Sequence, residues 1–126
     1  MRTIKQSYNI KAPIQSVWQA LVDPEVINEW GGGPAKMDDK VGIKFSLWGG
    51  DIYGKNIKVS PNKELVQEWF RGKWDKPSKV TFTLQEKGNK TEVNLFQEDV
   101  PEGEVEDIDE GWRKYYLGPL KGLLEK

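Results

Sequence analysis

VEDIDEGWRKYYLGPLKGLL, at residues 105–124, is the longest stretch of this 126-residue chain with the spacing of an amphipathic helix. Its apolar residues recur three and four positions apart, as on one helix face: Val105, Ile108, Trp112, Tyr115, Tyr116, Pro119, Leu120, Leu123 and Leu124. Gly118-Pro119 interrupts the pattern and should kink the helix, because proline lacks the amide hydrogen that a helical turn needs. The stretch therefore predicts one long, kinked C-terminal helix.

The first thirty residues predict a strand followed by two short helices. Residues 3–10 alternate between apolar and polar positions, which is typical of a strand with one buried face. Pro13 suits the start of a helix over residues 14–22. Asp23 then caps a second helix, which ends at Trp30 before a run of three glycines.

The middle of the chain predicts only strands and turns. Gly49-Gly50 suits a hairpin turn, and Gly54 suggests a β-bulge in the strand that follows. The predicted strands cover residues 43–47, 52–59, 65–70, 80–84 and 91–96. Strands without helices between them form an antiparallel meander, and only the C-terminal helix is long enough to cover its apolar face. We expect one α+β domain over residues 1–126, in which a curved antiparallel sheet wraps around the C-terminal helix.

Composition excludes several classes of chemistry. The chain has no cysteine, so a disulfide, a thiol nucleophile or a zinc–thiolate site cannot form. It has no histidine, so the commonest general base and the commonest metal ligand are missing. The net charge is −1, with 19 basic and 20 acidic residues, which argues against nucleic-acid binding. No apolar run approaches membrane-spanning length and no signal peptide is evident, so we expect a cytoplasmic protein with no membrane contact.

Six tryptophans in a chain this short have two interpretations. They could simply fill the core, since aromatic side chains dominate small cores. Alternatively, they could line a cavity between helix and sheet that holds a small apolar ligand. The residues that we predict to line such a cavity are Trp18, Phe45, Leu47, Ile57, Trp69, Phe82, Trp112, Tyr115, Tyr116 and Leu120. Gln67 and Arg71 flank Trp69 on the same strand face, and either one would need a polar partner or a ligand if buried.

An acidic stretch from Glu98 to Glu110 contains no lysine or arginine. It could be a solvated surface that also complements the positive start of the C-terminal helix. It could instead dock a basic partner surface, with Glu104, Glu106 and Asp107 as the contact residues. The glycine and spacing of a calcium-binding loop are absent, so we expect no metal site.

Several short motifs together resemble a known family. Residues 10–13 (IKAP), Val17-Trp18, Asp23-Pro24 and Glu29-Trp30 resemble the opening of START-like, helix-grip proteins. Residues 41–45 (VGIKF) and 111–116 (GWRKYY) are similar to the C-terminal domain of the activator of the ninety-kilodalton heat-shock chaperone's ATPase. The resemblance covers essentially the whole chain and implies the helix-grip fold.

The resemblance implies binding rather than catalysis. Relatives in this superfamily bind lipids, polyketides or other apolar molecules, and the co-chaperone carries its main ATPase-stimulating activity in a further N-terminal domain. We therefore expect a binding module for a small apolar ligand or for a heat-shock-protein-90-type chaperone, contacted weakly, and no cofactor. The alternative is a metal-independent cavity enzyme, of cyclase or hydrolase type, that uses Asp, Glu, Tyr or Arg side chains.

Overall fold

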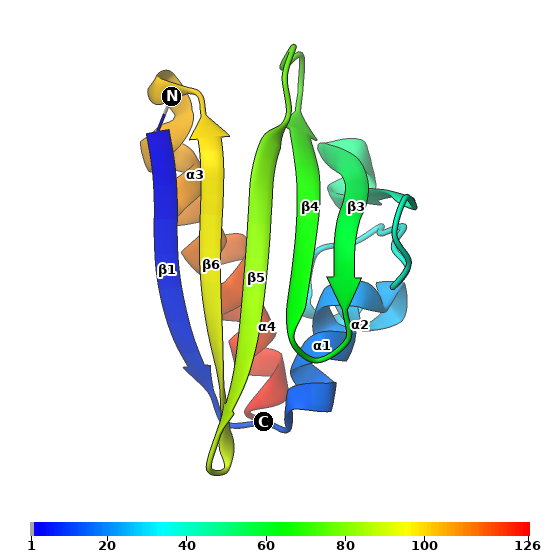
Figure 1. Ribbon diagram of the computed structural model, residues 1–126, viewed down its shortest axis with the longest axis vertical. Coiled ribbons are helices and arrows are strands. Elements are labelled where there is room, and N and C mark those ends of the chain that lie inside the picture. The colour runs from blue at the N-terminus through cyan, green and yellow to red at the C-terminus, as the bar shows by residue number, and fades with distance from the viewer. Residues whose placement is uncertain (1) are drawn as a thin grey trace.

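The protein is built on one six-stranded antiparallel sheet, seen in a computed structural model that describes residues 2–126 (Figure 1). The strand order is β1-β6-β5-β4-β3-β2. The last five strands form a meander, and the first strand is added at one edge, beside β6. The strands are β1 (Arg2–Ile10), β2 (Lys44–Leu47), β3 (Ile52–Ser60), β4 (Glu64–Arg71), β5 (Ser78–Lys87) and β6 (Lys90–Val100). The predicted strands and their antiparallel order are confirmed.

Two short helices follow β1, as the sequence predicts. Helix α1 spans Ile14–Val22 and helix α2 spans Pro24–Trp30. The Asp23 side chain accepts a hydrogen bond from the backbone N–H of Glu25, which satisfies one of the free donors at the start of α2. Gly31 ends α2 in the left-handed conformation, with φ of 106°.

The C-terminal helical region lies across one face of the sheet and is interrupted, although not where the sequence suggested (Figure 1). A short 3₁₀ turn η2 (Glu102–Glu104) leads into helix α3 (Val105–Gly111), and a π-helical turn η3 (Trp112–Tyr116) joins α3 to helix α4 (Leu117–Leu124). The irregular turn therefore precedes Gly118-Pro119. Pro119 has no backbone N–H, so it cannot donate the helical hydrogen bond to the carbonyl four residues earlier. The wider π turn just before it suits a helix in which that hydrogen bond is missing.

The β3 strand corrects one prediction about glycine. The bulge predicted at Gly54 lies instead between Asn56 and Lys58, where the β3–β4 register shifts by one residue. Gly54 is needed for a different reason, because a Cβ built on it would lie 1.7 Å from the carbonyl oxygen of Glu68. The glycine permits close approach of the neighbouring strand rather than a bulge.

The core lies between the sheet and the helices that cover it. Apolar residues from β1, α1, α2, β2, β4, β5, β6 and the C-terminal region are buried together in one cluster, against which the partly buried Ile52 and Val59 of β3 pack. A 3₁₀ turn, η1 (Trp48–Gly50), connects β2 to β3 beside this core. The α+β helix-grip architecture expected from the sequence is therefore confirmed.

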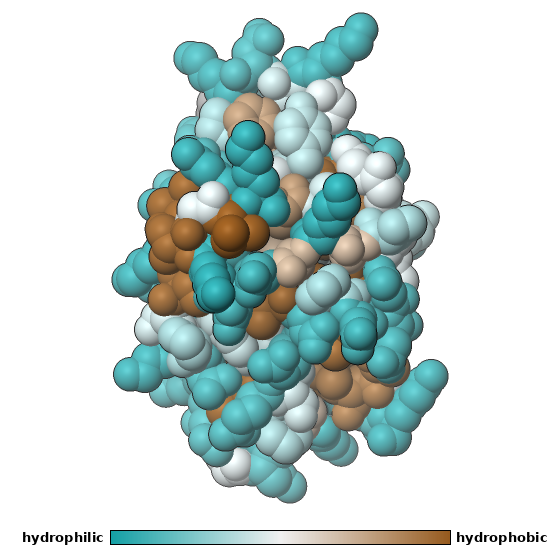
Figure 2. Space-filling model, turned by 90° about the vertical axis from the view of Figure 1, so that its right-hand side faces the viewer, coloured by the Kyte–Doolittle hydropathy of each residue, from teal (hydrophilic) through white to brown (hydrophobic). Residues whose placement is uncertain are grey.

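The surface on the side of β2 and β3 is mainly hydrophilic, with a few hydrophobic groups between the polar side chains (Figure 2). The large hydrophobic residues exposed in this part of the chain include Val41, Ile43 and Ile57. Within residues 2–126, no helix is long and apolar enough to cross a membrane.

Candidate functional site

The candidate site is a pocket of about 330 Å³ between the C-terminal helical region and the end of the sheet where β4 finishes. This end is uppermost in Figure 1. Six aromatic residues contribute to its wall: Trp48, Trp69, Trp74, Trp112, Tyr115 and Tyr116. Asp51, Arg71, Gln97 and Asp107 add polar atoms to the lining. The volume lies near the lower end of the range usual for small-molecule sites.

Tyr116 lies at the centre of an aromatic cluster beside this pocket. Its ring centroid lies between 4.5 and 6.2 Å from five others, which belong to Trp30, Trp48, Trp69, Phe82 and Trp112. Trp69 and Trp112 stack on one another, with centroids 4.8 Å apart and planes 29° from parallel. These separations are those of favourable aromatic pairs, so the cluster forms a rigid wall.

The π turn η3 explains how one short segment supplies three of these rings. Trp112 and Tyr116 are buried, whereas Tyr115 is 64% exposed and lies at the pocket's edge. Gly118 allows the backbone to close behind this turn, because a Cβ built on it would lie 1.9 Å from the carbonyl oxygen of Arg113. The sequence pattern of Gly118-Pro119 therefore shapes the pocket wall through the backbone rather than through its side chains.

Two buried glutamines fix the orientation of the stacked tryptophans. The indole N–H of Trp69 donates to Gln67 Oε1 at 2.8 Å, and the indole N–H of Trp112 donates to Gln97 Oε1 at 2.8 Å. Gln67 in turn donates to Asn56 Oδ1, and Gln97 donates to Ser78 Oγ. Every one of these buried amides thus has a partner within the protein, as buried polar groups require.

Arg71 joins the end of β4 to the start of the C-terminal helical region. Its guanidinium lies 3.3 Å from Glu104 Oε1 and 2.9 Å from Asp107 Oδ2. The other carboxylate oxygen of Glu104 accepts a hydrogen bond of 2.7 Å from the indole N–H of Trp74. We call this group, Arg71, Trp74, Glu104 and Asp107, the latch. It borders the pocket and ties the loop after β4 to η2 and α3.

The Tyr116 hydroxyl is the one buried side-chain polar atom without a hydrogen-bond partner among residues 2–126. Burial raises the pKa of this phenol well above its usual value, so it stays protonated at neutral pH. An unsatisfied buried hydroxyl costs stability in a folded protein. The hydroxyl oxygen is itself fully buried, although the residue belongs to the pocket lining.

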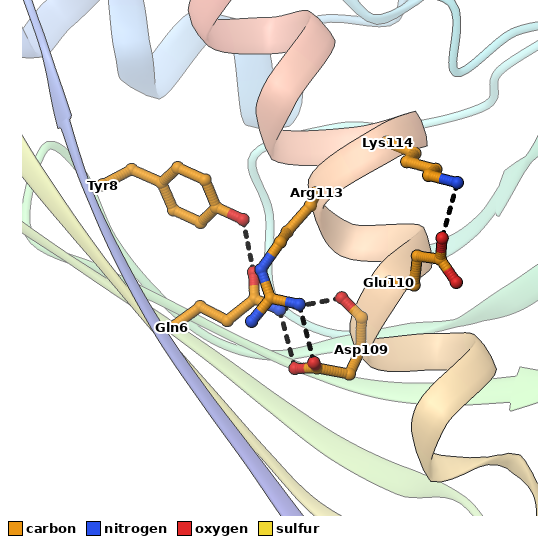
Figure 3. Close-up of polar contacts among 6 residues, drawn as sticks. All are labelled: Gln6, Tyr8, Asp109, Glu110, Arg113 and Lys114. Carbon is orange, nitrogen blue, oxygen red and sulfur yellow. Dashed lines mark hydrogen bonds and ion pairs between the residues drawn. The ribbon is translucent and has the colours of Figure 1, made fainter.

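A second polar group fastens α3 to β1 on the other side of the helix (Figure 3). The Gln6 amide donates at 2.8 Å to both the carboxylate and the backbone carbonyl of Asp109, and Arg113 donates to the same carboxylate at 2.7 Å. Burial opposes ionisation of Asp109, but these hydrogen bonds outweigh it and hold the pKa of the carboxyl below its usual value. Tyr8 completes the group by donating to Gln6, and burial raises the pKa of its phenol. This group positions the helix and lies outside the pocket lining.

The structure brings four of the ten predicted cavity residues to the pocket: Trp69, Trp112, Tyr115 and Tyr116. Five others are core residues outside its lining: Trp18, Phe45, Leu47, Phe82 and Leu120. The expectation for Ile57 does not match its position, since the residue is 40% exposed and lies at the register shift of β3. Asn56 immediately before it is buried, so Ile57 points outward by the ordinary alternation of a strand.

The three predicted docking residues differ in whether they form ion pairs within the protein. Glu104 and Asp107 are engaged by Arg71, whereas Glu106 lies exposed on the first turn of α3. Sequence reasoning did not identify Trp48, Trp74 or Gln97 as pocket residues. Their positions depend on contacts between distant segments, such as the bond between Trp74 and Glu104, which local patterns do not reveal.

Comparison with known proteins places this geometry in context. The family model described as "Activator of Hsp90 ATPase homolog 1-like protein" matches residues 11–125. An activator of 90 kDa heat shock protein ATPase homolog from Dictyostelium discoideum is 29% identical over 123 residues, which cover 95% of this chain and 32% of that protein. An uncharacterized protein of Schizosaccharomyces pombe is 28% identical over 120 residues, covering 94% of this chain and 36% of its own length.

Solved structures share the fold over the whole chain. The crystal structure of an HSP90 activator from Plasmodium falciparum superposes with a TM-score of 0.90 at 24% identity, covering 98% of this chain and 96% of that one. The chain spans about a third of the length of the curated relatives it matches.

Proposed function

This chain belongs to the activator of Hsp90 ATPase homolog 1-like family, and from that premise we propose that it is a binding module that associates with an Hsp90-type chaperone. The observation that carries the proposal is the match of the family model to residues 11–125, together with a relative named as an activator homolog. The proposal keeps the cytoplasmic location predicted from the sequence.

The acidic start of α3 is the docking surface in this proposal. Glu106 is exposed there, and the partly exposed carboxylates of Glu104 and Asp107 lie beside it. Complementary charge raises the rate of encounter and fixes orientation, so a basic surface on the chaperone would suit this region. Ion pairs between exposed groups are weak and screened by salt, which makes the expected contact weak and salt-sensitive.

A charge reversal at one exposed position tests this surface. Glu106→Lys should weaken binding to the chaperone several-fold, because it places a like charge against the basic partner. Glu86→Lys is the matched control, since Glu86 is exposed in β5 near the hairpin at the opposite end of the sheet. Equal binding by the wild type and both variants in calorimetric titration would remove the acidic start of α3 from the proposal.

The pocket supports a second candidate function, which is binding of a small and largely apolar molecule. The feature that favours it is a preformed concave site of about 330 Å³ with six aromatic residues in its lining. Native mass spectrometry of freshly purified protein would test this by showing a retained small molecule, and it would report the assembly state as well. Saturable quenching of tryptophan fluorescence by added ligands would extend the test. Absence of both would leave the pocket as a feature of packing only.

The enzyme alternative has less support. Of residues 2–126, Asp51 and Asp107 are the only carboxylates in the pocket lining, and the latch holds Asp107 in a salt bridge. Tyr116, whose pKa is raised by burial, is a weaker acid than a free phenol, which does not suit a general acid at neutral pH. We therefore propose binding without catalysis at this site.

A further inference from the structure

We propose that the pocket takes a small organic cation of the alkylammonium class, in preference to a neutral or anionic molecule of the same shape. This inference rests on the ligand-binding pocket proposed above and concerns the charge of its occupant. Two features carry it: the aromatic rings that the pocket offers and the balance of charge around its rim.

The tryptophans that line the pocket already use their polar edges within the protein. The indole N–H groups of Trp69 and Trp112 donate to Gln67 and Gln97, and that of Trp74 donates to Glu104. The indole N–H of Trp48 donates to the Gly31 carbonyl oxygen at 2.8 Å. Trp69 and Trp112 are buried and stack on one another, so the rings left for a ligand are those of the half-buried Trp48 and Trp74 and the exposed Tyr115. The faces of such rings carry the negative end of the aromatic quadrupole. Such faces attract cations, and several of them together form the cages that recognise alkylated ammonium groups.

The charge around the pocket is negative. Among residues 2–126, two carboxylates, of Asp51 and Asp107, line it against a single cation, Arg71. Arg71 is itself bonded to Asp107 and to Glu104, so its charge is offset by carboxylates at 2.9 and 3.3 Å. Glu102 and Glu106, next to Glu104 and Asp107 in the chain, are exposed. A cleft with one dominant sign of charge concentrates ligands of the opposite sign. The volume of about 330 Å³ limits the occupant to a small molecule.

Three probes of one shape and different charge test the assignment. Choline, 3,3-dimethylbutan-1-ol and 3,3-dimethylbutanoate share a branched head group of the same shape. Choline carries a positive charge on that group, the alcohol is uncharged, and the third compound carries a negative carboxylate. Binding is followed by titrating the indole N–H signals in NMR spectra of the intact protein. Choline should bind roughly 2- to 30-fold more tightly than the alcohol, which is the range of cation–aromatic energies converted to affinity, and the carboxylate should bind least.

Variants show whether the preference comes from this site. The double variant Asp51→Asn, Asp107→Asn should reduce the preference for choline over the alcohol several-fold while the alcohol still binds. Glu86→Gln changes the net charge at the far end of the sheet and should leave the preference unchanged. Equal or tighter binding of the alcohol or the carboxylate would overturn the cation assignment and leave a ligand pocket. Failure of all three probes to bind would remove the pocket function along with it.

Discussion

Replacement of Tyr116 by phenylalanine should make the protein more stable. The ring contributes to the aromatic cluster through five neighbours, and phenylalanine keeps all of those contacts. The hydroxyl, by contrast, is buried with no hydrogen-bond partner among residues 2–126. A buried hydroxyl left unpaired costs about 1–3 kcal/mol, so its removal should raise the free energy of unfolding by about 1 kcal/mol at pH 7. Urea unfolding followed by tryptophan fluorescence measures the difference.

The gain should grow in alkaline solution. Burial holds the folded-state pKa of Tyr116 above the usual value of 10.0, whereas the unfolded chain titrates near that value. The unfolded state therefore loses its proton first, and the wild type loses stability as pH rises above about 10. At pH 10.5 this amounts to about 0.8 kcal/mol, and phenylalanine at position 116 has no such loss.

Two results would refute this reasoning. A variant at least 1 kcal/mol less stable than the wild type at pH 7 would mean that the hydroxyl has a stabilising partner. A stability difference between the two proteins that stays constant from pH 7 to 10.5 would mean that the phenol ionises equally in both states.

The other predictions concern the helix and its surface. Trp112→Ala should cost about 3–5 kcal/mol in unfolding free energy, since the ring is buried between Trp69 and Phe82; a loss below about 1 kcal/mol in urea unfolding would contradict that placement. Gly118→Ala should destabilise the protein by about 2 kcal/mol or more, because the added Cβ would collide with the Arg113 carbonyl. A Cβ at Gly122 would have no atom within 4 Å, so Gly122→Ala should raise the free energy of unfolding by up to about 1 kcal/mol. Equal effects of the two variants in thermal unfolding would exclude a special role for Gly118. Arg71→Met should change stability by less than about 1 kcal/mol, because its ion pairs are partly exposed, and a larger loss in urea unfolding would show that the latch is a major stabilising contact.

Local sequence signals predicted the first part of the fold accurately. The boundaries of α1 and α2 follow from Pro13, Asp23 and Gly31, whose effects act within one helical turn. The meander from β2 to β6 followed from short apolar runs separated by turn residues, whereas the pairing of β1 with β6 was not predicted.

Features that depend on contacts between strands were harder to predict from the sequence. Gly54 was assigned a bulge because glycine in a strand has two explanations, and only the approach of Glu68 from β4 distinguishes them. Ile57 is exposed because the preceding Asn56 faces the core, an arrangement that an apolar residue type alone does not indicate. The interruption of the C-terminal helix was predicted, but the π turn lies before the proline that suggested it.

The candidate site was predicted in part for a similar reason. Trp69 and Trp112 were singled out by their residue type and position, and they do form the stacked wall of the pocket. The latch could not be predicted, because Arg71 and Glu104 are 33 positions apart and both types of residue are usually solvated. Gln67 was marked as needing a partner if buried, and the structure supplies Asn56 and Trp69.

The most direct test of the proposed function is the affinity of this chain for an Hsp90-type chaperone from the same organism, measured by calorimetric titration at about 50 mM and about 500 mM salt. Screening shortens the range of charge interactions from about 14 Å to about 4 Å over this interval. The account predicts weak binding at low salt that falls at least several-fold at high salt, with little stimulation of the chaperone's ATPase by this chain. Tight binding unaffected by salt, or no binding at either concentration, would contradict it.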